Sequence, residues 1–302
     1  MFGFSVPVFW SRGWNDDLAG ECPMSELSLV ERHRCEGGWV SRWQHDSLAT
    51  GTKMSFSVFE PPGVGPFPGL IYLAGLTCDD TTFMIKAGAQ RHAAGLGLML
   101  IAPDTSPRGL DLPGIRDAWD FGEAAGFYLD ATIDPWRQNF RMESYVTQDL
   151  LDAVAANFPL DRQRVGLMGH SMGGHGALTL GLKHPALFRT VSALAPIAAP
   201  SQVPWGQKAL PLFLGDDRSA WRRHDTVSLL QDGYHTGPWL VDQGSDDQFL
   251  AVQLGADLLQ AACAESGQEL TYRLHDDYDH GYYFIQTVID DHLDHHMAGL
   301  AA

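Results

Sequence analysis

The first regular feature of the chain is a pair of segments in which hydrophobic and polar residues alternate. They cover residues 38–44 (GWVSRWQ) and 52–59 (TKMSFSVF), and the stretch PPGVGPFP follows at 61–68. Alternation places every second side chain on one face of a half-buried strand, and clusters of Pro and Gly mark turns. The pattern therefore predicts an antiparallel pair of strands at the start of the fold.

Beyond residue 68, short apolar runs alternate with longer segments of helical periodicity. The apolar runs lie at 69–75, 96–104, 164–169, 189–196, 238–244 and 270–274, and the helical segments at 83–94, 143–157, 172–184, 248–265 and 282–298. Runs that are apolar on both faces are typical of parallel strands covered by helices. The sequence therefore predicts an α/β fold with a mostly parallel twisted sheet and helices on both of its faces.

Two long irregular stretches, 105–142 and 197–237, interrupt this alternation and are rich in Trp, Pro, Gly and Asp. Connections of this length inside a compact domain are usually functional, so we expect them to shape a pocket. Residues 1–23 precede the regular pattern and are expected to be an N-terminal extension whose role stays open, with Met24 as an alternative start. A single α/β domain is expected over residues 24–302.

The composition narrows the classes of partner. The chain has 302 residues, 45% of them hydrophobic, and a formal net charge of −17. Nucleic-acid binding needs a cationic surface, and anionic membranes repel an acidic protein. No stretch reaches the roughly 18 to 20 apolar residues that span a bilayer. We therefore expect a soluble protein that binds neither nucleic acid nor membrane.

The cysteines and the N-terminus indicate the compartment. Cys22, Cys35, Cys78 and Cys263 show neither CxxC spacing nor the density of a disulfide-rich secreted domain, which favours reduced thiols in a cytoplasm. The apolar run MFGFSVPVFW has no basic region and no small-residue cleavage site. No export signal is expected, and the predicted location is cytoplasmic.

The motif GHSMGGHGAL at 169–178 surrounds Ser171 with glycine. An apolar run precedes it and a helical segment follows, which is the context of a nucleophile elbow. A Cβ at Gly169 or Gly173 is expected to collide with the turn or the neighbouring strand. Gly174 and Gly176 are expected to let the helix pack close to the sheet. The alternative is a tight turn without chemistry, so the partners of Ser171 decide between the two.

A serine hydroxyl becomes a nucleophile when a histidine takes its proton and an acid orients the histidine. In α/β-hydrolases these residues follow one another as Ser, Asp or Glu, then His. The stretch DQGSDDQFL places Asp246 and Asp247 after an apolar run, and HDDYDHGYYF places His280 before the last helix. The sequence therefore predicts Ser171, Asp247 and His280 as a catalytic triad, with Asp246 as a solvated neighbour.

Other acids and histidines compete for these roles. Asp242 lies inside a strand pattern and is expected in the core or at a sheet edge, and His275 is expected on the surface at a strand end. His170 and His175 flank the serine. They are expected to pack around the elbow, because a general base approaches the hydroxyl from another loop.

The spacing of His292 and His296, four residues apart on the last predicted helix, is compatible with metal binding. No third ligand accompanies them, so a solvated His/Asp helix face is favoured. No metal and no cofactor are expected.

From about residue 24 to its end the chain resembles the S-formylglutathione hydrolases, the esterase D family of α/β-hydrolases. The resemblance rests on ten colinear blocks: HRCEGG (33–38), GLTCDD (75–80), APDTSPRG (102–109), AWDFGEAAGFYLDAT (118–132), DPW (134–136), FRMESYV (140–146), GHSMGGHGAL (169–178), APIAAPSQVPWGQKA (195–209), DQGSDDQFL (242–250) and YDHGYYF (278–284).

The resemblance implies an α/β-hydrolase fold with Ser171 as nucleophile, Asp247 as orienting acid and His280 as general base. It also implies an oxyanion hole made by the backbone N–H groups of Leu76 and Met172. The implied reaction is hydrolysis of S-formylglutathione to formate and glutathione through a formyl-enzyme, as in formaldehyde detoxification. A small-molecule thioester as partner and a homodimer follow from the same resemblance.

Several residues bear on details of this assignment. Cys78 is similar to a cysteine that the family carries near the active site, and its alternative role is that of a small buried hydrophobic residue. Gly281 stands where the family usually has serine. Arg108, Arg137 and Lys208 are candidates to attract anionic glutathione, against ordinary solvation or internal ion pairing.

Two alternative functions stay open at this point. The first is a general carboxylesterase or acyltransferase on the same scaffold, which differs in substrate. The second is a hydrolase-like binding protein without catalysis, which the presence of all three triad residues disfavours.

Overall fold

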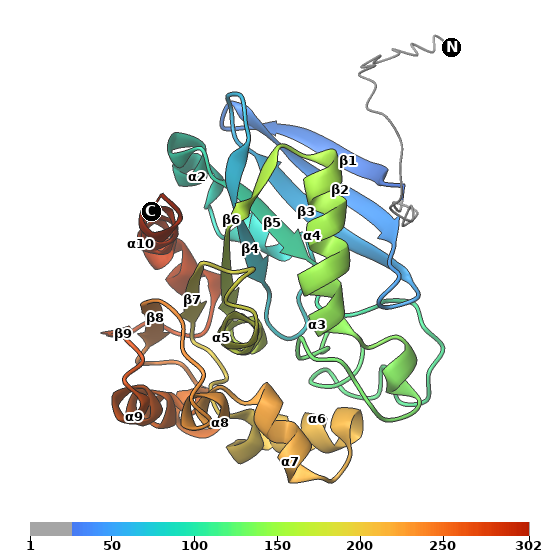
Figure 1. Cartoon of the computed structure of the whole chain (residues 1–302), viewed down its shortest axis with the longest axis vertical. Coiled ribbons are helices and arrows are strands. Elements are labelled where there is room, and N and C mark those ends of the chain that lie inside the picture. The colour runs from blue at the N-terminus through green and yellow to red at the C-terminus, as the bar shows by residue number, and fades with distance from the viewer. Residues whose placement is uncertain (1–25, 302) are drawn as a thin grey trace, which may run out of the picture.

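The structure is a computed structural model that describes residues 26–301, so the predicted extension at 1–23 lies outside the described residues. In the described part, nine strands form one sheet in the order β1-β2-β3-β5-β4-β6-β7-β8-β9 (Figure 1). The strands are β1 Ser28–Cys35, β2 Gly38–Asp46, β3 Lys53–Glu60, β4 Phe67–Leu73, β5 Met99–Pro103, β6 Leu160–His170, β7 Thr190–Leu194, β8 Trp239–Gly244 and β9 Leu270–His275.

The N-terminal part of the sheet is antiparallel. Strands β1, β2 and β3 are antiparallel neighbours, and β3 also pairs antiparallel with β5. The predicted opening pair corresponds to β2 and β3, whereas the sequence pattern did not predict β1. Its segment SLVERHRC is exposed along nearly its whole length. An edge strand that buries so little surface carries no alternating apolar signal.

From β5 to β9 all strands run parallel. Strands β4, β5, β7 and β8 are buried at every position. Because helices cover both faces of this region, its strands are continuous apolar runs. The predicted mostly parallel sheet with an antiparallel start is confirmed.

Helices cover the two faces of the sheet. Helices α2 and α10 lie on one face, and α4, α5, α8 and α9 lie on the other (Figure 1). The helices are α1 Thr82–Lys86, α2 Gln90–Leu96, α3 Met142–Ser144, α4 Leu150–Asn157, α5 Met172–Lys183, α6 Pro204–Leu214, α7 Arg218–Trp221, α8 Thr226–Gln231, α9 Ala256–Ser266 and α10 Tyr282–Leu300.

Glycine interrupts two of the predicted helices. The segment expected at 83–94 consists of α1 and α2 with Gly88 between them at φ +68°. The segment expected at 248–265 consists of a helical turn at Leu250–Leu254 and α9, with Gly255 between them at φ +65°. Glycine adopts positive φ without steric cost and commonly ends a helix. The apolar periodicity continues across both breaks, which explains why it predicts one helix in each case.

The two long stretches pack against each other. Residues 197–237 contain α6, α7 and α8. The rings of Phe121 and Phe140 from the 105–142 stretch lie 4.6 and 5.5 Å, between centroids, from Phe213 on α6. The backbone N–H of Thr132 also donates to the carbonyl of Phe213 at 2.8 Å. The two stretches therefore share an aromatic core.

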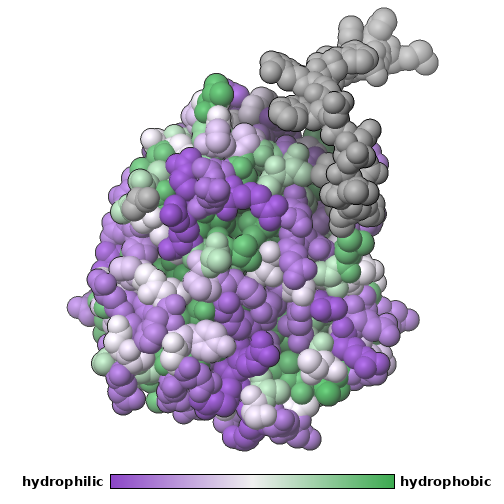
Figure 2. All heavy atoms as spheres, in the orientation of Figure 1, coloured by the Kyte–Doolittle hydropathy of each residue, from purple (hydrophilic) through white to green (hydrophobic). Residues whose placement is uncertain are grey.

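The outer surface contrasts with this interior. The face shown in Figure 2 carries mainly hydrophilic residues, with apolar patches between them. Within residues 26–301, no helix combines the length and the apolar character that crossing a membrane requires.

Candidate active site

Ser171 occupies the turn between β6 and α5. Its φ of +58° and ψ of −118° lie outside the regions that L-residues favour, and such strain persists only where the surrounding structure enforces it. A Cβ at Gly169 would overlap the carbonyl oxygen of Gly173, and a Cβ at Gly173 would overlap that of Leu73 on β4. The predicted need for glycine at both positions is confirmed.

Gly174 and Gly176 allow other segments of the chain to pack closely against α5. A Cβ on Gly174 would lie 2.8 Å from Pro196, and one on Gly176 would lie 2.7 Å from the ring of Tyr128. The expectation that they let α5 pack close to the sheet holds for Gly174, whose Cβ would also lie 3.3 Å from the carbonyl oxygen of Gly169 on β6, and not for Gly176. The closest neighbours of these two glycines are the loop after β7 and the 105–142 stretch. The sequence pattern does not show which neighbours a helix face contacts.

Asp247, which follows β8, forms a short hydrogen bond with His280, which precedes α10. Nδ1 of His280 lies 2.5 Å from Oδ2 of Asp247. Gln243 Nε2 donates to the same oxygen at 2.9 Å, and the backbone N–H of Phe249 donates to Oδ1 at 2.8 Å. Burial raises the pKa of the Asp247 carboxyl, but these hydrogen bonds and the His280 charge outweigh burial and hold it below its usual value. The carboxylate is ionised at neutral pH and stabilises a protonated imidazole.

The ring of His280 lies beside the elbow. Its centroid is 4.4 Å from that of His170, the residue before Ser171, and 5.0 Å from that of Phe249. The His280 side chain is only 12% exposed. Because Asp247 holds Nδ1, the nitrogen left to accept a proton is Nε2. Residues distant along the chain thus meet at one edge of the sheet.

The segment that carries Leu76 also reaches the elbow. A Cβ on Gly75 would lie 3.2 Å from the Cβ of Ser171. Met172 is the first residue of α5, and the first N–H groups of a helix have no intrahelical acceptor. The backbone N–H groups of Leu76 and Met172 therefore belong to the surroundings of the serine, where an oxyanion hole requires its donors.

Comparison of the chain with known proteins shows the family to which it belongs. A family model described as "Putative esterase" matches residues 47–295. The S-formylglutathione hydrolase of Rattus norvegicus is 46% identical over 283 residues, which cover 92% of this chain and 100% of the rat protein. The chain belongs to the S-formylglutathione hydrolase family of esterases. The S-formylglutathione hydrolase of Paracoccus denitrificans is 47% identical over 273 residues, 90% of this chain and 97% of the bacterial protein.

Solved structures agree with the family assignment. That of an S-formylglutathione hydrolase from Agrobacterium tumefaciens matches with a TM-score of 0.88 at 44% identity, over 90% of this chain and 99% of that one. The serine hydrolase FphF of Staphylococcus aureus, 18% identical with a TM-score of 0.66 over 86% of this chain and 98% of its own, shares the fold. The family resemblance and the α/β-hydrolase fold predicted from the sequence are confirmed.

The acids and histidines that compete for catalytic roles lie elsewhere. Asp246 is exposed, whereas its neighbour Asp247 is buried. Asp242 is buried in β8, and its Oδ1 accepts from Nε of Arg273 at 2.6 Å. His275 lies 3.3 Å from the same carboxyl and its side chain is only 25% exposed, so it is not the open surface residue that was expected.

His170 and His175 are packing residues around the elbow. The carbonyl of Phe127 lies 3.1 Å from Nε2 of His175, and neither ring nitrogen of His170 has a hydrogen-bond partner within residues 26–301. Burial lowers the pKa of both rings, to about 3 for His175. Both are therefore neutral at pH 7 and lie where the sequence analysis expected them.

His292 and His296 are fully buried, so the expected solvated helix face is wrong. Oγ of Ser192 on β7 lies 2.8 Å from Nδ1 of His292 and 2.9 Å from Nε2 of His296, and Thr190 Oγ1 lies 2.6 Å from Nδ1 of His296. The rings fasten α10 to the sheet. The described part of the chain holds no group of three or more His, Cys, Asp or Glu side chains placed to bind a metal.

The three candidate cations for glutathione each form an ion pair. Nη2 of Arg108 lies 2.6 Å from Oδ1 of Asp104, and Nε of Arg137 lies 2.6 Å from the aspartate three residues before it. Lys208 pairs with an aspartate of the other long stretch. Their charges are thus engaged within the protein.

The cysteines of the described part are free thiols at Cys35, Cys78 and Cys263, and Cys22 lies outside that part. Cys78 is half-buried, and burial raises the pKa of its thiol. A thiol that stays protonated is a poor nucleophile. The N–H of Gly281 donates to Oδ1 of Asp279 at 2.8 Å.

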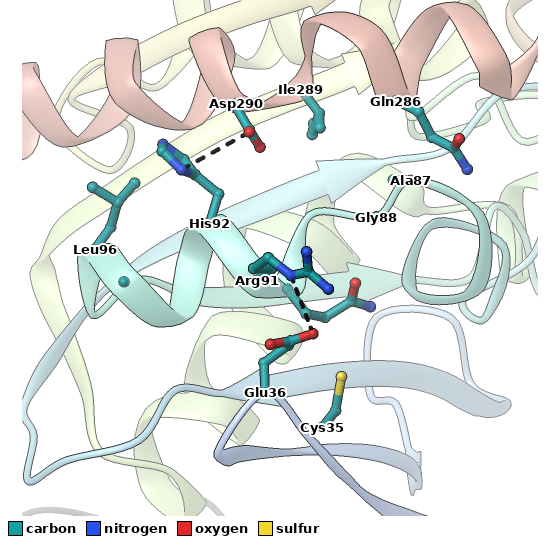
Figure 3. A pocket seen from close by; sticks show the side chains of 12 residues that line it. Cys35, Glu36, Ala87, Gly88, Arg91, His92, Leu96, Gln286, Ile289 and Asp290 are labelled. Carbon is teal, nitrogen blue, oxygen red and sulfur yellow. Dashed lines mark ion pairs between the residues drawn. The ribbon is translucent and has the colours of Figure 1, made fainter.

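A surface pocket of about 800 Å³ lies between the β1–β2 turn, α2 and α10 (Figure 3). Glu36 and Arg91 form an ion pair of 3.5 Å there, and His92 points toward Asp290 at 4.0 Å. The residues that line this pocket include none of the predicted catalytic side chains. This pocket is therefore separate from the elbow and from the hydrogen-bonded pair Asp247 and His280.

The sequence pattern did not single out Gln243, whose amide donates to the carboxylate of Asp247. Side chains alternate along β8, so Gln243 lies on the face opposite to Asp242. This position, four residues before Asp247, was the signal from which a contact between Gln243 and Asp247 could have been predicted. The sequence pattern also did not single out Phe249, which contacts His280 and lies 4.7 Å, between ring centroids, from Trp205.

Proposed function

We propose that the protein is a serine thioesterase that hydrolyses S-formylglutathione to formate and glutathione. Ser171 is the nucleophile, His280 the general base and Asp247 the acid that orients it. The observation that carries the proposal is the 2.5 Å hydrogen bond between Asp247 and His280 beside the strained serine. The substrate is supported by relatives that bear the name S-formylglutathione hydrolase and share almost half of their residues with this chain.

In the first step Nε2 of His280 takes the hydroxyl proton of Ser171, and Oγ attacks the formyl carbon. The π electron pair of the carbonyl moves to its oxygen, which becomes an oxyanion. Backbone N–H groups of Leu76 and Met172 stabilise this charge, and one such donor is worth about 10² to 10³ in kcat. Asp247 stabilises the imidazolium that forms.

The carbon–sulfur bond then breaks and leaves a formyl ester on Ser171. Glutathione departs as a thiol with a proton from His280. A thiol has a pKa of about 8.5, so its expulsion needs less help from the acid than that of an alcohol. Water, deprotonated by His280, attacks the formyl carbon. The bond between that carbon and Oγ of Ser171 then breaks, Oγ takes the proton back from His280, and formate is released.

The aromatic residues beside the base support a small acyl site. Phe249 lies against His280, Trp205 against Phe249, and Trp119 lies 5.7 Å, between ring centroids, from Trp205. Trp205 is buried, whereas Trp119 is 55% exposed. A row of rigid rings from the base to the surface leaves room for a formyl group and crowds a longer acyl chain.

The test is a hydrolysis assay of the purified protein on formyl, acetyl and longer glutathione thioesters, with short p-nitrophenyl esters alongside. We expect the formyl thioester to give the highest kcat/KM. A strong preference for the p-nitrophenyl esters would favour the general carboxylesterase instead. Ser171→Ala is expected to lower kcat about 10⁶-fold, and a variant that keeps its activity would leave only the binding-protein alternative.

A homodimer and a cytoplasmic location complete the proposal. A net charge of −17 supports a small-molecule partner over nucleic acid or an anionic membrane. Sedimentation of the purified protein is expected to give twice the mass of the chain, and a monomer would contradict this part of the proposal.

A further inference from the structure

The segment Gly75–Cys78, which carries the N–H of Leu76, is held in an unusual conformation. Thr77 has a φ of +68°, a value that a β-branched residue adopts only when its surroundings impose it. The N–H of Thr77 donates to the carbonyl of Ala124 at 3.0 Å. The hydroxyl of Tyr128 donates to the carbonyl of Ala74 at 2.9 Å. The 105–142 stretch thus holds this segment from outside.

The carbonyl of Cys78 is the third point of attachment. It accepts hydrogen bonds from Oγ1 of Thr105 at 2.7 Å and from Nη2 of Arg108 at 2.8 Å. A hydrogen bond from a charged donor is roughly twice as strong as one between neutral groups. The guanidinium is therefore the strongest of the contacts that anchor the end of the segment.

Asp104, which follows β5, holds Arg108 in place. Nε of Arg108 lies 3.1 Å from both carboxylate oxygens, and Nη2 lies 2.6 Å from Oδ1. The carboxylate is almost fully buried at 3% exposure. Burial raises the pKa of Asp104 to about 6 even though Arg108 opposes the shift. The carboxylate thus depends on Arg108 to remain ionised at neutral pH.

A buried ion pair of this kind adds little net stability, because desolvation offsets the attraction of the charges. Its position, with one guanidinium nitrogen shared between Asp104 and the Cys78 carbonyl, has a geometric consequence. The sheet end at Asp104 is joined through Arg108 to the segment beside Ser171. The anchored carbonyl lies only two positions after Leu76, so movement at Cys78 displaces the Leu76 N–H.

We propose that Arg108, held by Asp104, is a positioning residue that keeps the Leu76 N–H aimed at the oxyanion. The inference rests on the proposed function of Ser171 and of the oxyanion hole. It gives Arg108 a role different from the attraction of glutathione. Arg108 acts through the Cys78 carbonyl and does not touch the substrate.

The test compares kcat and KM of Arg108→Ala, Arg108→Lys and Asp104→Asn with the unmodified enzyme. A misplaced oxyanion donor affects the transition state and not the bound substrate, so we expect kcat to fall about 10- to 100-fold with little change in KM. Lysine keeps the charge without the planar fork and is expected to recover part of the loss. Arg116→Ala is the matched control, because Arg116 lies in the same stretch, is 58% exposed and forms an ion pair with Glu123.

A second readout separates positioning from general damage to the fold. A trifluoromethyl ketone analogue of the thioester forms an oxyanion on Ser171, so its affinity is expected to fall in proportion to kcat/KM in the three variants. Thermal unfolding of each variant is recorded alongside. If Arg108→Ala does not fold, Arg108→Lys and Asp104→Asn carry the comparison.

Two outcomes would overturn the proposal. One is an unchanged kcat in Arg108→Ala. The other is a rise in KM for S-formylglutathione with normal turnover of p-nitrophenyl acetate, which would make Arg108 a contact for the glutathione carboxylates. Failure of the proposed function can be told apart from failure of this inference. If the enzyme is inactive on S-formylglutathione but active on p-nitrophenyl acetate, the effect of Arg108 on the oxyanion contact is still measured from kcat on the ester.

Discussion

The exchange Asp247→Asn keeps the shape of the side chain and replaces one carboxylate oxygen by an NH₂ group. The amide oxygen can still accept from the N–H of Phe249, which donates to Oδ1 at 2.8 Å. The NH₂ group then takes the place of Oδ2, which now lies 2.5 Å from His280 Nδ1 and 2.9 Å from Gln243 Nε2. Gln243 can turn its amide to offer Oε1, which has no partner within residues 26–301, at the loss of the 3.1 Å hydrogen bond from its Nε2 to the Gly244 carbonyl. His280 has no such option and must carry its proton on Nε2.

In the proposed mechanism this change of tautomer removes the nitrogen that accepts the proton of Ser171. In the triad of a serine protease the same exchange lowers kcat about 10⁴-fold. That factor corresponds to about 5.4 kcal/mol of activation free energy. We expect a loss of this order here. The free energy of unfolding should change far less, because the asparagine keeps its hydrogen bonds to Phe249 and Gln243.

The assay follows formate release at saturating S-formylglutathione, with Asp246→Asn as the matched control. Asp246 is adjacent, exposed and equally charged, so its variant reports the loss of one negative charge without loss of the hydrogen bond to His280. The control is expected to turn over like the unmodified enzyme. The reasoning is refuted if Asp247→Asn turns over as fast as Asp246→Asn while both remain folded.

Four further expectations follow from packing and burial. Gly173→Ala should lower the free energy of unfolding by about 3 kcal/mol, because its Cβ would overlap the Leu73 carbonyl. Gly95→Ala, on α2 with open space around it, should raise it by about 0.5 to 1 kcal/mol, and thermal unfolding that shows the reverse order would contradict this packing. Phe249→Ala should raise kcat/KM for a butyryl thioester relative to the formyl one, and an unchanged ratio would remove Phe249 from the acyl site. Burial lowers the pKa of His224 to about 3, so the unfolded chain binds more protons below pH 6.5 and stability falls as the pH drops. At pH 5 the free energy of unfolding is about 2 kcal/mol lower than at pH 8 because of this group. In denaturant titrations His224→Gln should therefore lose about 2 kcal/mol less than the unmodified protein over this range. Parallel pH profiles of the two proteins would show that His224 is protonated in the native state.

Features that depend on neighbours in the sequence were predictable from it. The motif is visible within five residues because glycine flanks Ser171 at 169 and 173, and a Cβ at Gly169 would meet the turn itself, although one at Gly173 would meet the carbonyl of Leu73 on β4. The apolar runs announced the parallel strands because those strands are buried on both faces. The ten motif blocks also indicated the family, because each block is a short continuous stretch of sequence.

Features that depend on which distant groups meet were decided by the tertiary structure alone. His292 lies on Ser192, a hundred residues away, although its own helix reads as a polar face. The sequence left Arg108 between attraction of glutathione, solvation and internal ion pairing, and only the structure shows that it donates to the carbonyl of Cys78, thirty residues earlier. The edge strand β1 left no pattern because it buries almost nothing. A side chain's type shows what it can bind, but only the folded chain brings a partner within hydrogen-bond distance and removes the water that would otherwise compete.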